Sequence, residues 1–152
     1  MADALTGLYQ EVILDHSKRK IGFGELENPG AERFERNPTC GDEITLQMSM
    51  EPGTDRIASL AWRGAGCSIS MASASVLADT APGMTIPEFR ETVEAFREML
   101  RSRGEGEPDI EVLGDAVAFH GVSKYVMRVK CAMLGWVAAE VCCDQLVAAT
   151  QD

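Results

Sequence analysis

The sequence predicts an α+β fold, in which a small antiparallel sheet of about three strands packs against several helices. Residues 43–50 and 56–64 alternate apolar and polar side chains, as half-buried strands do. Residues 85–103 instead repeat apolar side chains at the spacing of an amphipathic helix. Because the predicted order is one helix, then strands, then helices, the two kinds of element are segregated along the chain, which is typical of α+β proteins.

The first half of the chain is predicted to hold one helix and the sheet. The helix covers residues 5–17, and residues 20–30, rich in glycine, form a loop. A possible first strand begins at Ala31 and ends at Pro38, and a turn at 51–55 joins the next two strands. One face of the helix carries Leu5, Leu8, Tyr9, Val12 and Ile13.

The second half is predicted to be helical. A helix rich in small residues covers 68–81 and stops at Pro82. Thr85 and Glu88 form a capping box for the amphipathic helix, whose apolar face carries Phe89, Val93, Phe96 and Leu100. Residues 104–109 form a polar break, a short segment then leads to Gly114 and Asp115, and the last helix runs from about Met127 to Ala149.

Length and charge narrow the class of protein. The 152 residues contain no internal repeat, so we expect one domain that spans 1–152. Asp and Glu outnumber Lys and Arg by 24 to 14, and the net charge of −10 argues against a nucleic-acid partner. The N-terminus lacks the basic start and apolar run of a signal peptide, and no stretch approaches the roughly 20 apolar residues that span a bilayer. We therefore expect a cytoplasmic protein without a membrane partner, whose five cysteines stay reduced.

Three of the five cysteines lie at the ends of predicted elements. Cys40 lies in a turn before a strand, with Asp42 two residues later. Cys67 follows a glycine-rich turn at the start of a helix, where the helix dipole favours thiolate. Cys131 lies near the predicted start of the last helix, where the dipole and the neighbouring Arg128 and Lys130 favour thiolate again. Taken singly, each position also suits an ordinary structural residue.

These residues together suit a metal better than a disulfide framework. Three thiolates and the Asp42 carboxylate supply the four ligands of tetrahedral zinc, and soft thiolates also suit copper(I) or iron–sulfur clusters. The chain has no Cys-x-x-Cys pair, so a zinc finger is disfavoured. Cys142 and Cys143 are adjacent in a helix and point about 100° apart, so we interpret them as packing residues.

Four motifs resemble the SufU and IscU family of iron–sulfur assembly proteins. They are LYQEVILDHSK, NPTCGDEITL, GAGCSISMASAS and RVKCAMLGW, and they cover nearly the whole chain in matching order. Two features resemble the SufU branch in particular. The segment between Cys67 and Cys131 is long and includes an extra stretch around 104–115, and Lys130 stands where the IscU branch has a histidine.

The resemblance implies an IscU-like fold and a zinc-dependent sulfurtransferase, an enzyme that accepts persulfide sulfur from a SufS-type cysteine desulfurase and stimulates it. It implies Cys40, Asp42, Cys67 and Cys131 as the zinc ligands, with Cys40 as the sulfur acceptor and Arg128 near the zinc. A downstream SufBCD-type scaffold is a further implied partner. One departure is that Tyr125 and Val126 stand where family members often have a phenylalanine–proline pair.

The sequence leaves two alternative functions for the thiolates, and it contains three further polar side chains to which we assign no chemistry. The same thiolates would suit a scaffold that holds a [2Fe–2S] cluster, or a zinc-stabilised interaction module without chemistry of its own. His16 is expected on a helix surface or in a cap, and His120 in an exposed loop. Asp115 is expected to cap or pack, without a chemical role.

Overall fold

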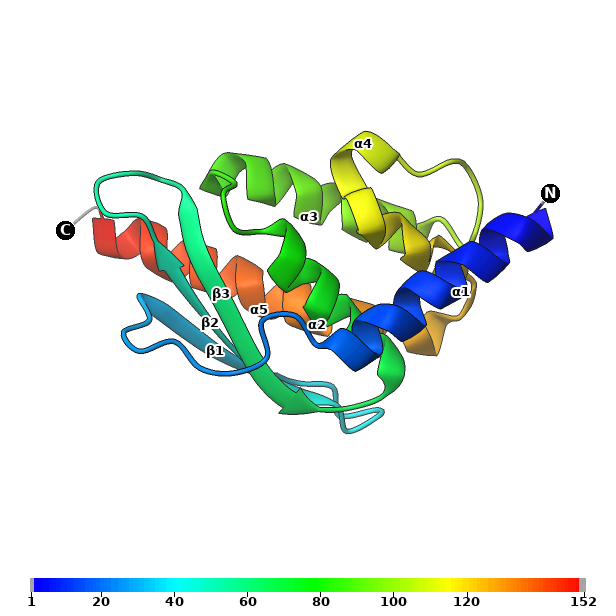
Figure 1. Ribbon diagram of the computed structural model, residues 1–152, viewed down its shortest axis with the longest axis horizontal. Coiled ribbons are helices and arrows are strands. Elements are labelled where there is room, and N and C mark those ends of the chain that lie inside the picture. Colours follow the sequence, from blue (N-terminus) through cyan, green and yellow to red (C-terminus); the bar gives the residue numbers. More distant parts are fainter. Residues whose placement is uncertain (1, 151–152) are drawn as a thin grey trace.

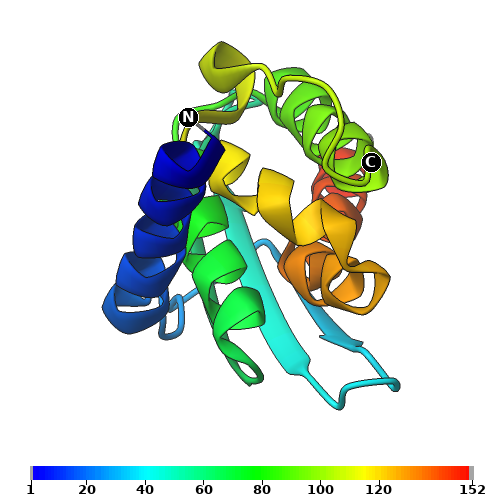
Figure 2. The ribbon, with the colours of Figure 1, turned by 90° about the vertical axis from the view of Figure 1, so that its right-hand side faces the viewer.

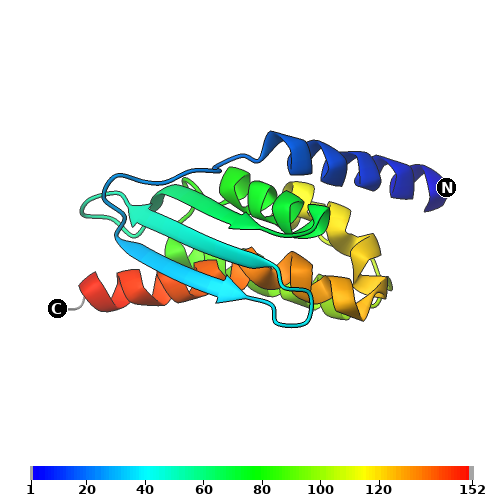
Figure 3. The same ribbon diagram turned by 90° about the horizontal axis from the view of Figure 1, so that it is seen from below.

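The computed structural model describes residues 2–150, and side chains from residue 7 to residue 149. Its three strands form one antiparallel sheet in the order β1-β2-β3, and helices cover one face of that sheet (Figures 1 and 3). The predicted α+β class, with three strands and several helices, is confirmed. The strands are β1 (Ala31–Arg36), β2 (Glu43–Met50) and β3 (Ile57–Ala65). The helices are α1 (Ala2–Arg19), α2 (Ser68–Thr80), α3 (Ile86–Arg101), α4 (Ile110–Leu113), the 3-10 helix η1 (Gly114–Lys124) and α5 (Val126–Thr150).

The helices form two layers on the sheet. α2 and α5 pack directly against the strands, α3 and η1 lie over α5, and α1 runs along α2 (Figure 2). The alternation predicted in β2 is confirmed in part. Ile44, Leu46 and Met48 are buried and Met50 is half-buried, but the polar Gln47 is buried as well, where its amide accepts from Leu26 N–H and donates to Glu32. The core therefore lies between the sheet and the helical layer.

The less regular pattern of β3 has a structural reason. Its consecutive residues Leu60, Ala61 and Trp62 are all buried. The predicted loop at 20–30 runs beside this strand, where Gly24 N–H donates to the Trp62 carbonyl at 2.8 Å and Trp62 N–H donates to the Gly22 carbonyl at 3.0 Å. The loop thus pairs with the edge of β3, which protects that edge from pairing with another chain.

The start of α3 agrees with its sequence pattern. Thr85 is the N-cap, its hydroxyl accepts from Glu88 N–H, and the Glu88 carboxylate accepts from Thr85 N–H, each at 3.2 Å. The predicted capping box is confirmed, and so is the apolar face of this helix. All four of its members are buried, namely Phe89, Val93, Phe96 and Leu100.

The inward face of α1 differs from the prediction. Leu8 is 53% exposed, whereas His16 is only 1% exposed. The side chain of Leu5 lies outside the described residues. The prediction of a surface or capping role for His16 is therefore wrong, because the last turns of α1 pack against α2 and η1 and bury the imidazole there.

The segment from 110 to 124 contains more regular helix than its sequence indicated. Asp109 caps α4 by accepting from Glu111 N–H and Val112 N–H, and η1 then continues to Lys124. η1 buries Phe119, whose ring meets that of Phe96 edge to face at 5.8 Å between centroids. A search for the helical period of 3.6 residues misses such an element, because a 3-10 helix repeats every three residues.

α5 is the one described helix long and apolar enough to cross a membrane, by length and composition alone. The expectation that no stretch approaches such a span was therefore wrong. More than half of its apolar window is buried inside the fold, against β1, β2 and α2. This packing is that of a core helix.

Candidate metal centre

Four predicted site residues meet where three segments converge. The β1–β2 loop carries Cys40 and Asp42, Cys67 is the N-cap of α2, and Cys131 lies in the second turn of α5. The four side chains differ in solvent exposure. Asp42 is 4% exposed and Cys131 is 2% exposed, whereas Cys67 is half-buried and Cys40 is exposed.

Backbone hydrogen bonds shape the β1–β2 loop. Asn37 N–H donates to the Asp42 carbonyl at 2.9 Å, and Gly41 N–H donates to the Asn37 carbonyl at 2.7 Å. Gly41 has a φ of 77°, a left-handed conformation that favours glycine. The closed loop holds Asp42 in the interior while Cys40 stays at the surface.

Asp42 also meets the start of α2. Cys67 N–H donates to Asp42 Oδ1 at 3.3 Å, so the carboxylate lies at the positive end of the helix dipole. A Cβ at Gly66 would lie 2.8 Å from Asp42 Cγ, so this approach requires glycine. The glycine-rich turn therefore brings the carboxylate and the Cys67 thiol together.

The donor atoms of Cys40, Asp42 and Cys131 lie close enough together to bind one cation. Cys40 Sγ lies 3.5 Å from Cys131 Sγ, and Cys67 Sγ lies 3.5 Å from Asp42 Oδ2. One ligand atom each from Cys40, Asp42 and Cys131 lies within 4.8 Å of the others. Zinc–sulfur bonds of about 2.3 Å place tetrahedral ligand atoms about 3.6–3.8 Å apart. Cys67 Sγ lies beside Asp42 but outside this group of three, and it would supply the fourth ligand of zinc. Thiol ligands also suit an iron–sulfur cluster.

Burial and hydrogen bonding move two pKa values in opposite directions. Burial alone would raise the pKa of Asp42, but hydrogen bonds from Ser70 and the three site thiols lower it below its usual 3.8. Burial, together with hydrogen bonds to Cys40 and Asp42, raises the pKa of Cys131 above its usual 9.0. The expected thiolate-favouring effect of the helix start is therefore outweighed at Cys131, and a bound cation is what would keep this sulfur deprotonated.

The side chains of the two basic residues beside Cys131 form no hydrogen bond or ion pair with the ligand candidates within residues 7–149. Arg128 and Lys130 are exposed, and within residues 7–149 neither side chain forms an ion pair. Tyr125 and Val126, which replace the phenylalanine–proline pair, lead directly into α5, where the Tyr125 carbonyl accepts from Arg128 N–H at 2.9 Å. The substitution therefore leaves the start of α5 helical.

Ser70 belongs to the site, although the sequence analysis assigned it no role. Its hydroxyl is buried and donates to Asp42 Oδ2, and it also lies 3.6 Å from Cys67 Sγ. The available signal was its position one turn into α2 after Cys67, which places it on the side of the ligands. Ser70 orients the carboxylate that would bind the cation.

We expect Ser70→Ala to weaken zinc binding about 10–100-fold, because ligands that lose their orienting partners lose affinity by that order. Competition with a chromophoric chelator measures the change. Ser68→Ala is the matched control, since Ser68 is exposed in the same turn of α2. Equal zinc affinity in both variants would contradict the orienting role of Ser70.

Cys142 and Cys143 lie apart from this site, in the middle of α5. Both are fully buried, and burial raises the pKa of each thiol to about 12. We expect neither to react with iodoacetamide in the folded protein at neutral pH, which peptide mass mapping would test. In the unfolded chain the pKa of these thiols is near 9.0, so they ionise there at lower pH than in the folded protein. The free energy of unfolding should therefore be unaffected by them below pH 9.0 and should fall as the pH rises from 9.0 towards 12. Labelling of either thiol by iodoacetamide in the folded protein would contradict the expectation that both are unreactive.

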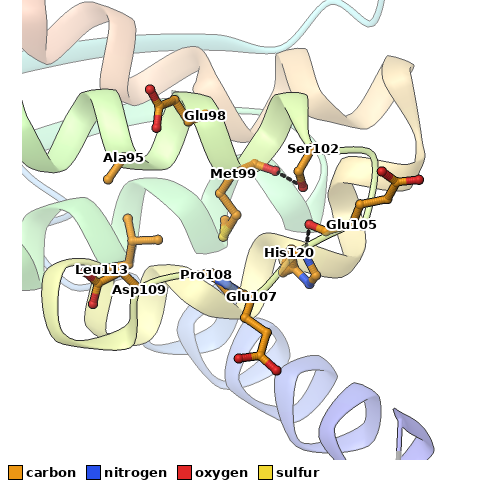
Figure 4. Close-up of a pocket in the computed structure, with 11 residues that line it drawn as sticks. Ala95, Glu98, Met99, Ser102, Glu105, Glu107, Pro108, Asp109, Leu113 and His120 are labelled. Atoms are coloured by element: carbon orange, nitrogen blue, oxygen red, sulfur yellow. Dashed lines mark hydrogen bonds between the residues drawn. The ribbon is translucent and has the colours of Figure 1, made fainter.

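A separate pocket of about 290 Å³ lies between α3 and residues 104–113 (Figure 4). Met99 and Leu113 line it, and His120 is half-buried at its edge, where its Nε2 lies 3.1 Å from the Glu105 carbonyl. His120 is thus in η1 and partly covered, not in an exposed loop as predicted. The Glu105 and Glu107 carboxylates point away from the pocket in Figure 4, so the polar groups do not converge on a ligand there.

Known proteins resemble this chain in sequence. The family model of the NifU-like N-terminal domain matches residues 8–132. The zinc-dependent sulfurtransferase SufU of Bacillus subtilis strain 168 is 40% identical over 136 residues, which are 90% of this chain and 89% of that protein. The iron–sulfur cluster assembly scaffold protein IscU of Streptococcus pyogenes serotype M1 is 38% identical over 134 residues, which are 88% and 81% of the two chains.

Solved structures resemble it in fold. An iron–sulfur cluster assembly scaffold protein for the SUF system from Fervidobacterium islandicum AW-1 has a TM-score of 0.80 at 35% identity, covering 88% of this chain and 94% of the other. The N-terminal part of a NifU-like protein from Brucella abortus has a TM-score of 0.81 at 26% identity, covering 92% and 94%. The chain therefore belongs to the family of NifU-like N-terminal domains, which its fold and its cysteine cluster also fit.

Proposed function

We propose that this protein works in iron–sulfur cluster assembly as a zinc-dependent sulfurtransferase of the SufU type. Its partner would be a SufS-type cysteine desulfurase in the cytoplasm, from which it accepts persulfide sulfur and which it stimulates. A SufBCD-type scaffold would be a downstream acceptor. The similarity to the SufU of Bacillus subtilis supports this class of activity.

The observation that carries the proposal is the uneven exposure of the four ligand candidates. Asp42 and Cys131 are buried, whereas Cys40 lies at the surface on a loop closed by its own backbone. A partner protein can therefore reach the sulfur of Cys40 without unfolding the rest of the site. An acceptor thiol needs such access, whereas a purely structural zinc ligand does not.

The transfer is a thiol exchange at Cys40. The Cys40 thiolate attacks the terminal sulfur of the desulfurase persulfide, the sulfur–sulfur bond of the desulfurase breaks, and the desulfurase cysteine leaves as a thiolate. Cys40 then carries the persulfide, and no external oxidant or reductant is needed. Bound zinc would keep the ligand thiols deprotonated at neutral pH. Arg128, exposed on the first turn of α5, is proposed to balance negative charge as the partner docks.

An iron–sulfur scaffold is the second candidate, because the chain is nearly as similar to a scaffold protein IscU as to SufU. One feature of the sequence favours transfer. Lys130 stands next to Cys131, and lysine is not among the usual ligands of iron–sulfur clusters, which are cysteine and histidine.

Metal analysis and an absorbance spectrum of the isolated protein separate the two candidates. A colourless protein with one zinc per chain would support transfer, and a brown protein with iron and sulfide would support the scaffold. Desulfurase turnover of cysteine should also rise when this protein is added. Unchanged turnover with zinc present would reject sulfur transfer in favour of a zinc-stabilised interaction module.

A further inference from the structure

A second cluster of metal-ligating side chains lies away from the cysteines. His16 of α1, Asp79 of α2 and Asp115 of η1 each place one ligand atom within 4.8 Å of the others. Asp79 is in the last turn of α2, whereas Cys67 caps the first turn. Twelve residues of helix at about 1.5 Å each separate the two by about 18 Å.

The imidazole of His16 is buried, and a hydrogen bond between its Nδ1 atom and Ser75 orients it. Its Nδ1 lies 2.8 Å from Ser75 Oγ, and the same hydroxyl accepts from Ile21 N–H at 3.0 Å. Nε2 faces the carboxylates and lies 3.0 Å from Asp115 Oδ2. A histidine that binds a metal through one nitrogen is usually oriented in this way, by a hydrogen bond at the other nitrogen.

The charge around this cluster is unbalanced. Two carboxylates approach one imidazole, and among the residues with described side chains no lysine or arginine pairs with Asp79 or Asp115. Asp79 also lies at the negative end of the α2 dipole, and the last turn of α2 contains no basic residue. A cation at this point would be favoured by both carboxylates and by the helix end.

We propose that His16, Asp79 and Asp115 bind a divalent first-row transition cation, with water filling the remaining positions. One imidazole and two carboxylates form a harder donor set than the thiolates, so this site would accept manganese(II), which thiolates bind poorly. Asp79 and Asp115 are exposed, so the cation can enter from solvent. Since the three ligands come from three elements that pack together (Figure 2), binding would tie α1 to α2 and η1.

The test is a manganese(II) titration of the protein as isolated, followed by electron paramagnetic resonance. We expect one bound manganese per chain and a higher melting temperature in its presence. Asp79→Asn and Asp115→Asn should each weaken binding at least about 10-fold, since even the loss of an orienting partner has an effect of that order. Asn at position 115 keeps the size of Asp115 and a side-chain oxygen beside His16, so the variant should fold.

Asp15→Asn is the matched control, because Asp15 is exposed beside His16 on α1 but pairs with Arg19 instead. It should bind manganese as the unaltered protein does. Absence of binding to the unaltered protein would overturn the proposal, and so would equal binding by Asp79→Asn and Asp115→Asn. Neither result would bear on the cysteine site, because sulfur transfer is not measured.

Discussion

Cys40→Ser is expected to abolish sulfur acceptance from a cysteine desulfurase, by at least about 1,000-fold, because a hydroxyl cannot replace the thiolate as nucleophile or carry the sulfur. The unaltered protein, incubated with desulfurase and cysteine, should gain the mass of one sulfur atom. Peptide mapping should place that sulfur on Cys40, the exposed member of the cluster. Stimulation of desulfurase turnover should disappear in the same variant.

The control for this experiment is Cys143→Ala, which removes a fully buried thiol about three turns along α5 from Cys131. It should accept sulfur as the unaltered protein does. Zinc content of Cys40→Ser should be measured in parallel, because a lost ligand weakens the site as well as removing the nucleophile. Sulfur found on Cys67 or Cys131 in the unaltered protein would contradict the role of Cys40, whatever the zinc content of the variant.

Trp136→Ala is expected to cost about 3–5 kcal/mol of unfolding free energy, the range for truncating a large buried aromatic side chain. Trp136 is fully buried and stacks on Phe96 at 4.3 Å between ring centroids. Its indole N–H donates to Ser73 Oγ at 2.9 Å, and Ser73 donates to the Ala132 carbonyl at 2.6 Å. This chain of hydrogen bonds joins α2 to α5 beside Cys131.

Two further variants separate packing from hydrogen bonding at this position. Trp136→Phe keeps a ring but removes the donor, so it should cost about 1–3 kcal/mol. Tyr125→Ala, at an exposed residue, should change stability by no more than about 0.5 kcal/mol. Urea unfolding measures all three, and a Trp136→Ala protein as stable as Tyr125→Ala would contradict the importance of this contact.

The local features of the fold were predicted well because they depend on neighbouring residues. The pattern of β2 and the capping box of α3 each depend on a few residues that are close together in the sequence. The segment 110–124 was missed because its 3-10 period and its glycines give no amphipathic signal. The buried residues of η1 can be identified only from the helices that cover them.

The sequence by itself determined the order of the elements and the four candidate ligands, since Cys40, Asp42, Cys67 and Cys131 stand in recognisable motifs. The tertiary structure decided which polar side chains are enclosed. His16 is buried because the end of α1 packs against α2 and η1, and Ser70 is buried where the start of α2 meets Asp42 of the β1–β2 loop. Burial also outweighs the helix-start effect at Cys131. The physical reason is that burial depends on segments far apart in the chain, and burial sets both hydrogen bonding and pKa.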